Sequence, residues 1–228
     1  MGDRIDYAAD GATMRGYRAR PDTPNGAALL VVPAFAGLRD FEMAQADRLA
    51  AMGYDVLGVD YYGDGWTAAD MKEASQAMQR LNTDRPALLR RTEAALDLIS
   101  EGRPVGAVGF CFGAKAVLDL ARAGHLDAAV SLHGIYDRPP TDTRTMPPVL
   151  LCHGWNDPLA TPADLGAMAE ELEAHSPDWH ALCFGQTGHA FTNPDQGDES
   201  TAQMGYVAAS AERTQAAVDA FFARYLIR

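Results

Sequence analysis

The chain has 228 residues, of which 47% are hydrophobic and 22% are charged, so it can bury one substantial core and needs no second domain. We therefore expect residues 1–228 to form a single domain. Nineteen Lys and Arg residues stand against 31 Asp and Glu residues, a formal net charge of −12. This acidic balance, with no basic run longer than Arg90-Arg91, argues against nucleic acid or an anionic membrane surface as a partner.

The opening residues MGDRIDYAADG carry acids where a secretory signal would have basic and then apolar residues. No run approaches the ~18 consecutive apolar residues of a membrane span. Three cysteines cannot form a fully paired disulfide framework, and none of them has a CxxC spacing. We expect a soluble, cytoplasmic protein with reduced thiols.

Short apolar runs alternate with longer segments of helical period, which is typical of a mostly parallel sheet with helices on both faces. Two segments near the N-terminus, Arg4–Tyr7 and Met14–Arg20, favour a hairpin. Each further strand is a continuous apolar run, as expected for strands buried on both faces. We predict these strands over Ala27–Val32, Tyr54–Val59, Val105–Phe110, Ala128–Leu132, Val149–Cys152 and Trp179–Phe184. The fold class is therefore α/β.

Helix signals fill the gaps between these strands. Asp40 is a candidate N-cap for the first helix, and Thr161 opens a capping box for a later one. Apolar residues at helical spacing near the end of the sequence predict a helix packed on the sheet. The predicted helices run from Asp40 to Met52, over Met71–Met78, from Ala114 to Ala121, from Thr161 onward and from Met204 to Tyr225. Residues 138–148, rich in proline, are expected to form a surface loop.

The sequence Gly109-Phe110-Cys111-Phe112-Gly113 follows a predicted strand and opens a helix of small residues. Glycines at these two positions are typical of a nucleophile elbow, a sharp strand-to-helix turn in which larger side chains would clash. Such a turn holds the Cys111 thiol above the sheet at a helix N-terminus, where backbone dipoles favour the thiolate. It also points the amide of Phe112 toward a developing oxyanion. The alternative is an inert buried thiol at a tight turn.

Two further candidates follow later strands, Asp157 in CHGWNDP and His189 in FGQTGHAFTNP. The order nucleophile, acid, histidine is that of a catalytic triad on loops beyond the carboxyl ends of parallel strands. In this hypothesis Cys111 attacks a carbonyl carbon, His189 transfers the proton, and Asp157 orients the histidine. If each residue is considered alone, the alternative interpretation of Asp157 is a turn residue, and that of His189 is a solvated loop histidine.

The remaining histidines and cysteines give weaker signals. His133 and His153 lack the close spacing of metal ligands, so we interpret them as hydrogen-bonded structural residues. Cys152 and Cys183 lie in apolar strands and are expected to be packing residues. No phosphate-binding loop or dinucleotide fingerprint follows a strand, and the sequence predicts no metal and no cofactor.

With these residues in place, the sequence resembles the dienelactone hydrolase family of α/β-hydrolases over nearly all its length. The resemblance rests on LLVVPAFAGLRDF, LAAMGYDVLGVDYYGDG, GFCFGAK, CHGWNDP and HAFTNP, which occur in the family's order. It implies a single-domain α/β-hydrolase that opens small lactones or cleaves small carboxylic esters through a thioester intermediate, without a metal or organic cofactor. It also implies that the amide of Phe35 joins that of Phe112 in an oxyanion hole.

Two positions depart from the family pattern. The family has a glutamate, which helps to generate the thiolate, at the position matched to Ala34. It has an arginine, which grips a substrate carboxylate, at the position of Asn193. Glu42 lies further along and is not assumed to replace the missing glutamate. An uncharged ester, or a substrate with its anion placed differently, is compatible with Asn193.

Several residues are open to two interpretations. Tyr61 and Tyr62 either line the substrate pocket or form a Gly-rich turn. Arg85, Arg90 and Arg91 either recognise an anion or lie on a solvated helix face. The departures also leave a second function open, a catalytically weak protein of the same fold that binds a small molecule or senses thiols. The sequence identifies neither the substrate nor the oligomeric state.

Overall fold

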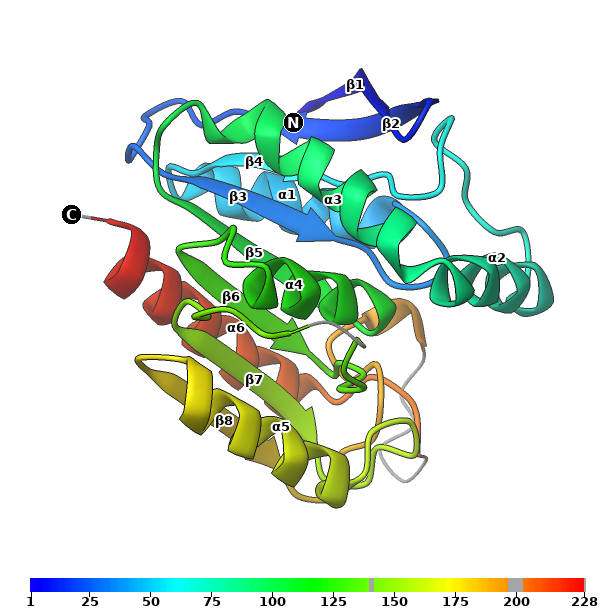
Figure 1. Cartoon of the computed structure of the whole chain (residues 1–228), viewed down its shortest axis with the longest axis vertical. Coiled ribbons are helices and arrows are strands. Elements are labelled where there is room, and N and C mark those ends of the chain that lie inside the picture. Colours follow the sequence, from blue (N-terminus) through cyan, green and yellow to red (C-terminus); the bar gives the residue numbers. More distant parts are fainter. Residues whose placement is uncertain (140–141, 197–202, 228) are drawn as a thin grey trace.

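The computed structural model describes residues 1–139, 142–196 and 203–227. Within these ranges an eight-stranded sheet runs in the order β1-β2-β4-β3-β5-β6-β7-β8 (Figure 1). Strands β1 and β2 form an antiparallel hairpin, β2 pairs antiparallel with β4, and the other neighbours are parallel. The strands are β1 (Asp3–Ala9), β2 (Ala12–Ala19), β3 (Ala28–Val32), β4 (Asp55–Gly58), β5 (Val105–Phe110), β6 (Ala128–Leu132), β7 (Val149–Gly154) and β8 (Trp179–Phe184). The predicted α/β fold is confirmed.

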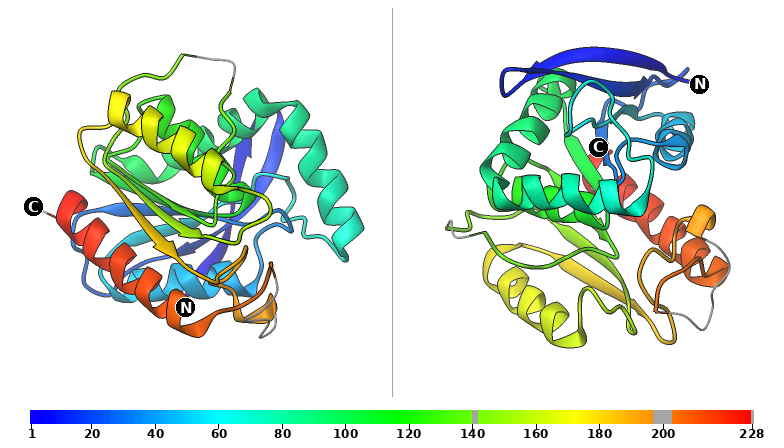
Figure 2. Two further views of the ribbon diagram at one scale, coloured as in Figure 1. Left: turned by 90° about the horizontal axis from the view of Figure 1, so that it is seen from below. Right: turned by 90° about the vertical axis from the view of Figure 1, so that its right-hand side faces the viewer.

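Helices cover both faces of this sheet. Helices α3, α4 and α5 pack on one face, and α1 and α6 pack on the other (Figures 1 and 2). Their bounds are α1 (Asp40–Ala51), α2 (Met71–Thr83), α3 (Arg85–Ser100), α4 (Phe112–Arg122), α5 (Pro162–His175) and α6 (Ala208–Leu226). None of the helices in the described ranges is long and apolar enough to cross a membrane.

The central strands are apolar throughout because both of their faces are covered. Every residue of β3, β5 and β6 is buried. Strand β8 differs, since it lies at the edge of the sheet and has a single neighbouring strand. Cys183 of β8 is exposed, so its predicted packing role is wrong, whereas Cys152 of β7 is buried as expected.

Three helix starts differ from the prediction, and one of them is that of α4, which begins at Phe112 instead of Ala114. Helix α1 begins at Asp40 itself, so its N-cap is Arg39, whose backbone N–H donates to the side chain of Glu42 at 3.2 Å. Helix α6 begins only at Ala208. The preceding Met204 instead forms an isolated β-bridge with His189. The segment that enters α6 therefore packs beside a candidate catalytic residue.

The strand order places the loops after β3 and β5 at a topological switch point. After β3 the chain adds β4 on one side, and it then crosses over to add β5 on the other side of β3. Loops that leave two neighbouring parallel strands in opposite directions open a crevice at the carboxyl edge of a sheet. This edge lies at the side where α2 projects, and it faces the viewer in the right-hand view of Figure 2.

Candidate active site

Cys111 occupies a strained turn between β5 and α4. Its backbone has φ 53° and ψ −113°, a conformation that residues with a side chain rarely adopt. The two flanking positions must be glycine because a side chain at either one would clash with backbone atoms. A Cβ at Gly109 would lie 2.4 Å from the carbonyl oxygen of Gly113, and a Cβ at Gly113 would lie 2.2 Å from that of Pro33. The turn has the geometry expected of a nucleophile elbow.

Asp157 and His189 lie in the loops after β7 and β8, and their side chains meet. His189 Nδ1 lies 2.7 Å from Asp157 Oδ2, and both side chains are buried. The other carboxylate oxygen, Oδ1, accepts the backbone N–H groups of Leu159 at 2.8 Å and Ala160 at 3.3 Å. One carboxylate therefore both shapes its own turn and orients the imidazole.

The surroundings of His189 favour a charged imidazole. Burial alone would lower its pKa, but the charge of Cys111 and the hydrogen bond to Asp157 outweigh this effect and raise the pKa of His189 to about 10. The second ring nitrogen, Nε2, is buried, and a hydrogen bond with Cys111 also helps to raise the pKa of His189. This nitrogen is available for proton exchange with a group in the adjoining cavity.

A cavity of about 310 Å³ joins these groups, close to the lower end of the range of ligand pockets, about 300–1,000 Å³. Cys111 and His189 both line it, as do Ala34, Phe35 and Asn193, three of the residues predicted around the substrate. The other lining residues among those described are Phe41, Glu42, Met71, Ser75, Met78, Phe110, His133, Ile135, Leu159, Ala190, Gln196 and Met204.

Of the two residues predicted to donate to an oxyanion, Phe35 lines the cavity, whereas Phe112 is not among its described lining residues. Phe112 is the first residue of α4, so its N–H has no partner carbonyl within the helix. Phe35 lies in the loop after β3 and lines the cavity. The close approach of Gly113 to the carbonyl of Pro33 brings the start of α4 against that same loop.

Tyr61 and Tyr62, whose role the sequence left open, brace this loop and do not line the cavity in the described residues. The hydroxyl of Tyr61 donates to the carbonyl oxygens of Pro33 at 3.0 Å and Ala34 at 2.7 Å, and that of Tyr62 donates to Phe35 at 2.8 Å. Both tyrosines therefore act on the loop through its carbonyl groups.

The arginines considered for anion recognition are engaged elsewhere. Arg85 pairs with Asp119 at 2.7 Å, and Arg90 pairs with Asp10 at 2.8 Å. Arg91 donates to the carbonyl oxygen of Tyr61 at 2.9 Å. None of the three lines the cavity.

Glu42 was not among the site residues predicted from the sequence. Its side chain is 4% exposed and lines the cavity, where it accepts the backbone N–H of Ala34 at 3.4 Å in addition to that of Arg39. The sequence contained a signal for this position, because Glu42 precedes the buried Ala46 and Leu49 by four and seven residues and so shares their helix face. Burial raises the pKa of Glu42 to about 7.

Because its carboxyl group is buried, Glu42 should make the free energy of unfolding depend on pH. Glu42 binds its proton more tightly in the folded protein than in the unfolded chain, so the free energy of unfolding should fall as the pH rises from 4.5 to 7. The contribution corresponds to about 3 kcal/mol. The variant Glu42→Gln should therefore gain stability relative to the wild type between pH 5 and pH 8, as measured by urea unfolding. Glu170→Gln, at an exposed position in α5, is the control. Equal pH slopes for Glu42→Gln and the wild type would contradict the prediction.

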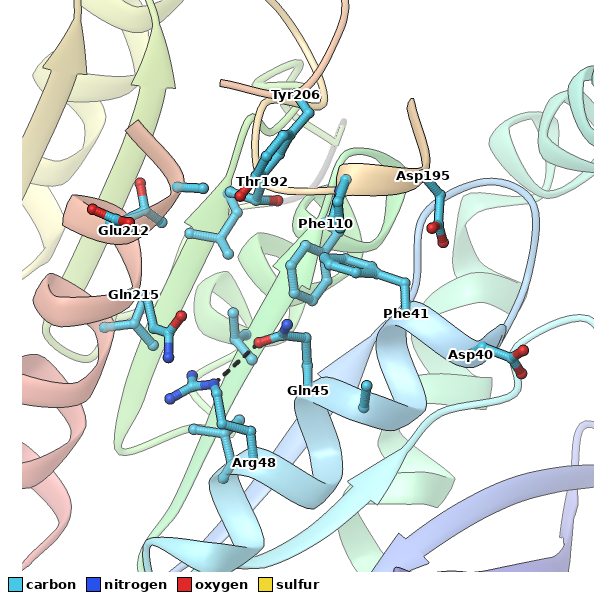
Figure 3. Close-up of a pocket in the computed structure, with 18 residues that line it drawn as sticks. Asp40, Phe41, Gln45, Arg48, Phe110, Thr192, Asp195, Tyr206, Glu212 and Gln215 are labelled. Carbon is cyan, nitrogen blue, oxygen red and sulfur yellow. Dashed lines mark hydrogen bonds between the residues drawn. The ribbon is translucent and has the colours of Figure 1, made fainter. Parts of the chain in front are cut away.

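A second cavity, of about 460 Å³, lies on the other side of the Phe41 and Phe110 rings, whose centroids are 5.2 Å apart. Helices α1 and α6 form its two sides, with Arg48 on one and Gln215 on the other (Figure 3). Although it is the larger of the two, neither Cys111 nor His189 lines it. The predicted nucleophile and histidine both line the smaller cavity.

The model of the dienelactone hydrolase family matches residues 14–226. The chain belongs to the dienelactone hydrolase family. The match extends from β2 to the end of α6, so every residue of the candidate site lies inside it. As a member of this family, the protein is a hydrolase.

Individual relatives agree with membership of the dienelactone hydrolase family. The chain is 27% identical over 195 residues to "Dienlactone hydrolase 1" of Gibberella moniliformis, a match that covers 78% of this chain and 73% of the relative. The solved structure of a protein called m3DLH is 29% identical, with a TM-score of 0.91, over 99% of this chain and 98% of that one. A dienelactone hydrolase-like promiscuous phosphotriesterase, P91, from metagenomic libraries is also 29% identical at the same coverage, with a TM-score of 0.86.

Proposed function

We propose that this protein hydrolyses a small carboxylic ester or lactone through an acyl-enzyme formed on Cys111, with His189 and Asp157 as its partners. The observation that carries the proposal is the buried 2.7 Å hydrogen bond between His189 and Asp157, combined with the influence of Cys111, whose charge and hydrogen bond raise the pKa of the same imidazole. Cys111, at the strained turn of the elbow, lines the same cavity as that imidazole. Nucleophile, base and orienting acid are the parts that covalent catalysis requires.

In acylation, the Cys111 sulfur attacks the substrate carbonyl carbon and a carbon–sulfur bond forms. The carbonyl oxygen becomes an oxyanion, which the N–H groups of Phe35 and Phe112 stabilise. The tetrahedral intermediate then collapses, the carbon–oxygen bond to the alcohol breaks, and the departing alkoxide takes a proton from the His189 imidazolium.

Deacylation uses the change in charge that acylation causes. An acylated sulfur is neutral, so the Cys111 charge that helps to raise the pKa of His189 disappears. The imidazole is then a neutral base that removes a proton from water as the water attacks the thioester carbonyl. Cys111 leaves as the thiolate when the carbon–sulfur bond breaks, the carboxylic acid is released, and the imidazolium is restored.

The proposal predicts a transient acyl group on one sulfur. Protein mixed with 4-nitrophenyl acetate and quenched in acid should gain one acetyl group by intact-mass spectrometry, and peptide mapping should locate it at Cys111. The group should disappear at the rate of steady-state turnover. An adduct at another residue would refute the assignment. An adduct on Cys111 that forms but never hydrolyses would favour a thiol-sensing protein.

A further inference from the structure

The cavity that holds Cys111 has few groups able to carry charge. Among its described lining residues there is no lysine or arginine, Glu42 has the only carboxyl group, and the other negative charge is that of the Cys111 sulfur. Two histidines also line the cavity. Burial lowers the pKa of His133 well below its usual value, so that ring is neutral, and the positive charge of His189 is matched by Asp157. An anion in the cavity would find no free cation.

Glu42 adds a group that disfavours anions further. Its carboxyl is buried and, among the residues that the structure describes, accepts only backbone N–H groups. Arg39, whose charge acts on Glu42, does not line the cavity, and its guanidinium donates to the carbonyl oxygen of Ala68. A substrate carboxylate would therefore be desolvated next to a carboxylate, and like charges brought together in this way are unfavourable.

Apolar side chains lie at the mouth of the cavity, beside the exposed polar residues Ser75 and Gln196. Met71 of α2, Leu159 after β7 and Met204 before α6 line it, and they are 62%, 49% and 42% exposed. Large apolar side chains from three separate segments thus meet at one opening. Exposed apolar groups that gather in this way mark a binding surface, and unbranched methionines adapt to ligands of different shape.

From these observations we propose that the site selects uncharged esters with an apolar acyl chain and rejects esters whose acyl chain ends in a carboxylate, with Glu42 as the residue that sets this preference. The inference rests on the proposed function, since it assigns a substrate class to the same cavity. Glu42 determines specificity here through its charge, and the rim of Met71, Leu159 and Met204 supplies the apolar contact.

The test uses two substrates that differ in one group. The 4-nitrophenyl esters of hexanoic acid and of adipic acid have the same leaving group and chain, and the terminal methyl of the first is a carboxylate in the second. At pH 8 the wild-type kcat/KM for the hexanoate should exceed that for the hemiadipate by about 100-fold, because like charges at close range cost several kcal/mol. The ratio of the two values cancels any step that both substrates share.

Two variants assign the preference to residues. Glu42→Gln removes the charge and should narrow the ratio about tenfold, in line with one charge–charge interaction in a partly buried site. Leu159→Arg adds a cation at the rim and should also lower the ratio of kcat/KM for the hexanoate to kcat/KM for the hemiadipate. Trp155→Arg is the matched control, because Trp155 is 51% exposed in the same loop and does not line the cavity. The control should leave the ratio unchanged.

The outcomes separate this inference from the function on which it rests. Hydrolysis that depends on Cys111 but proceeds equally fast with both esters would overturn the preference and leave the proposed function standing. A preference that Glu42→Gln and Leu159→Arg both leave intact would overturn the assignment to the cavity charge and rim. Turnover that persists in Cys111→Ala would instead contradict the proposed function.

Discussion

Replacing Cys111 with alanine should lower kcat/KM for 4-nitrophenyl acetate by about 10⁴-fold or more, because removing the nucleophile of a triad abolishes the covalent pathway. His189→Ala should cause a loss of similar size. The double variant should be no worse than either single one, since the two groups act in the same steps. Steady-state kinetics at pH 8 measures all three variants.

The control for this prediction is another buried cysteine. Cys152 lies in β7, burial raises the pKa of its thiol to about 12, and it does not line the cavity. Cys152→Ala should keep the wild-type kcat. If Cys111→Ala retained more than a tenth of the wild-type activity, Cys111 could not be the nucleophile.

Gly113→Ala should destabilise the protein by about 3 kcal/mol, the upper part of the usual range for overpacking a buried site. The added methyl would lie 2.2 Å from the carbonyl oxygen of Pro33 and 2.3 Å from that of Val32. Both obstacles are backbone atoms at the end of β3, so α4 would have to move away from the sheet. Urea unfolding monitored by circular dichroism gives the difference.

Gly166→Ala is the matched control for that substitution. Gly166 lies in α5, is exposed, and has nothing within 4 Å of the position of an added Cβ. Alanine should stabilise this helix by about 0.5–1 kcal/mol because glycine loses more backbone entropy on folding. A Gly113→Ala protein as stable as the wild type would show that β3 and α4 are not tightly packed at the elbow.

The central sheet was predictable because its strands are buried on both faces. Val105–Phe110 and Ala128–Leu132 were predicted with the bounds that the structure has. The exposure of β8 was not visible, since Trp179–Phe184 has an apolar composition and only the strand order makes it an edge. Helix α3 was not among the predicted helices, although a helix face was one of the two interpretations of Arg85, Arg90 and Arg91.

The candidate site was predictable where a short motif fixes the local backbone. The glycines around Cys111 and the loop position of His189 belong to this class. The roles of Tyr61 and Glu42 depend instead on how β4 and α1 pack against the loop after β3, which is a matter of tertiary distance. No spacing within either segment encodes that distance.

Helix α2 contributes Met71 and Met78 to the cavity wall and none of the groups proposed to act on the reacting atoms. It packs against α3, and its Leu81 joins the core on the face of the sheet that α3, α4 and α5 cover. Substitutions along α2 can thus alter which molecules are accepted while the reaction centre keeps its form. Relatives of this protein can therefore acquire new substrates through substitutions in α2 alone.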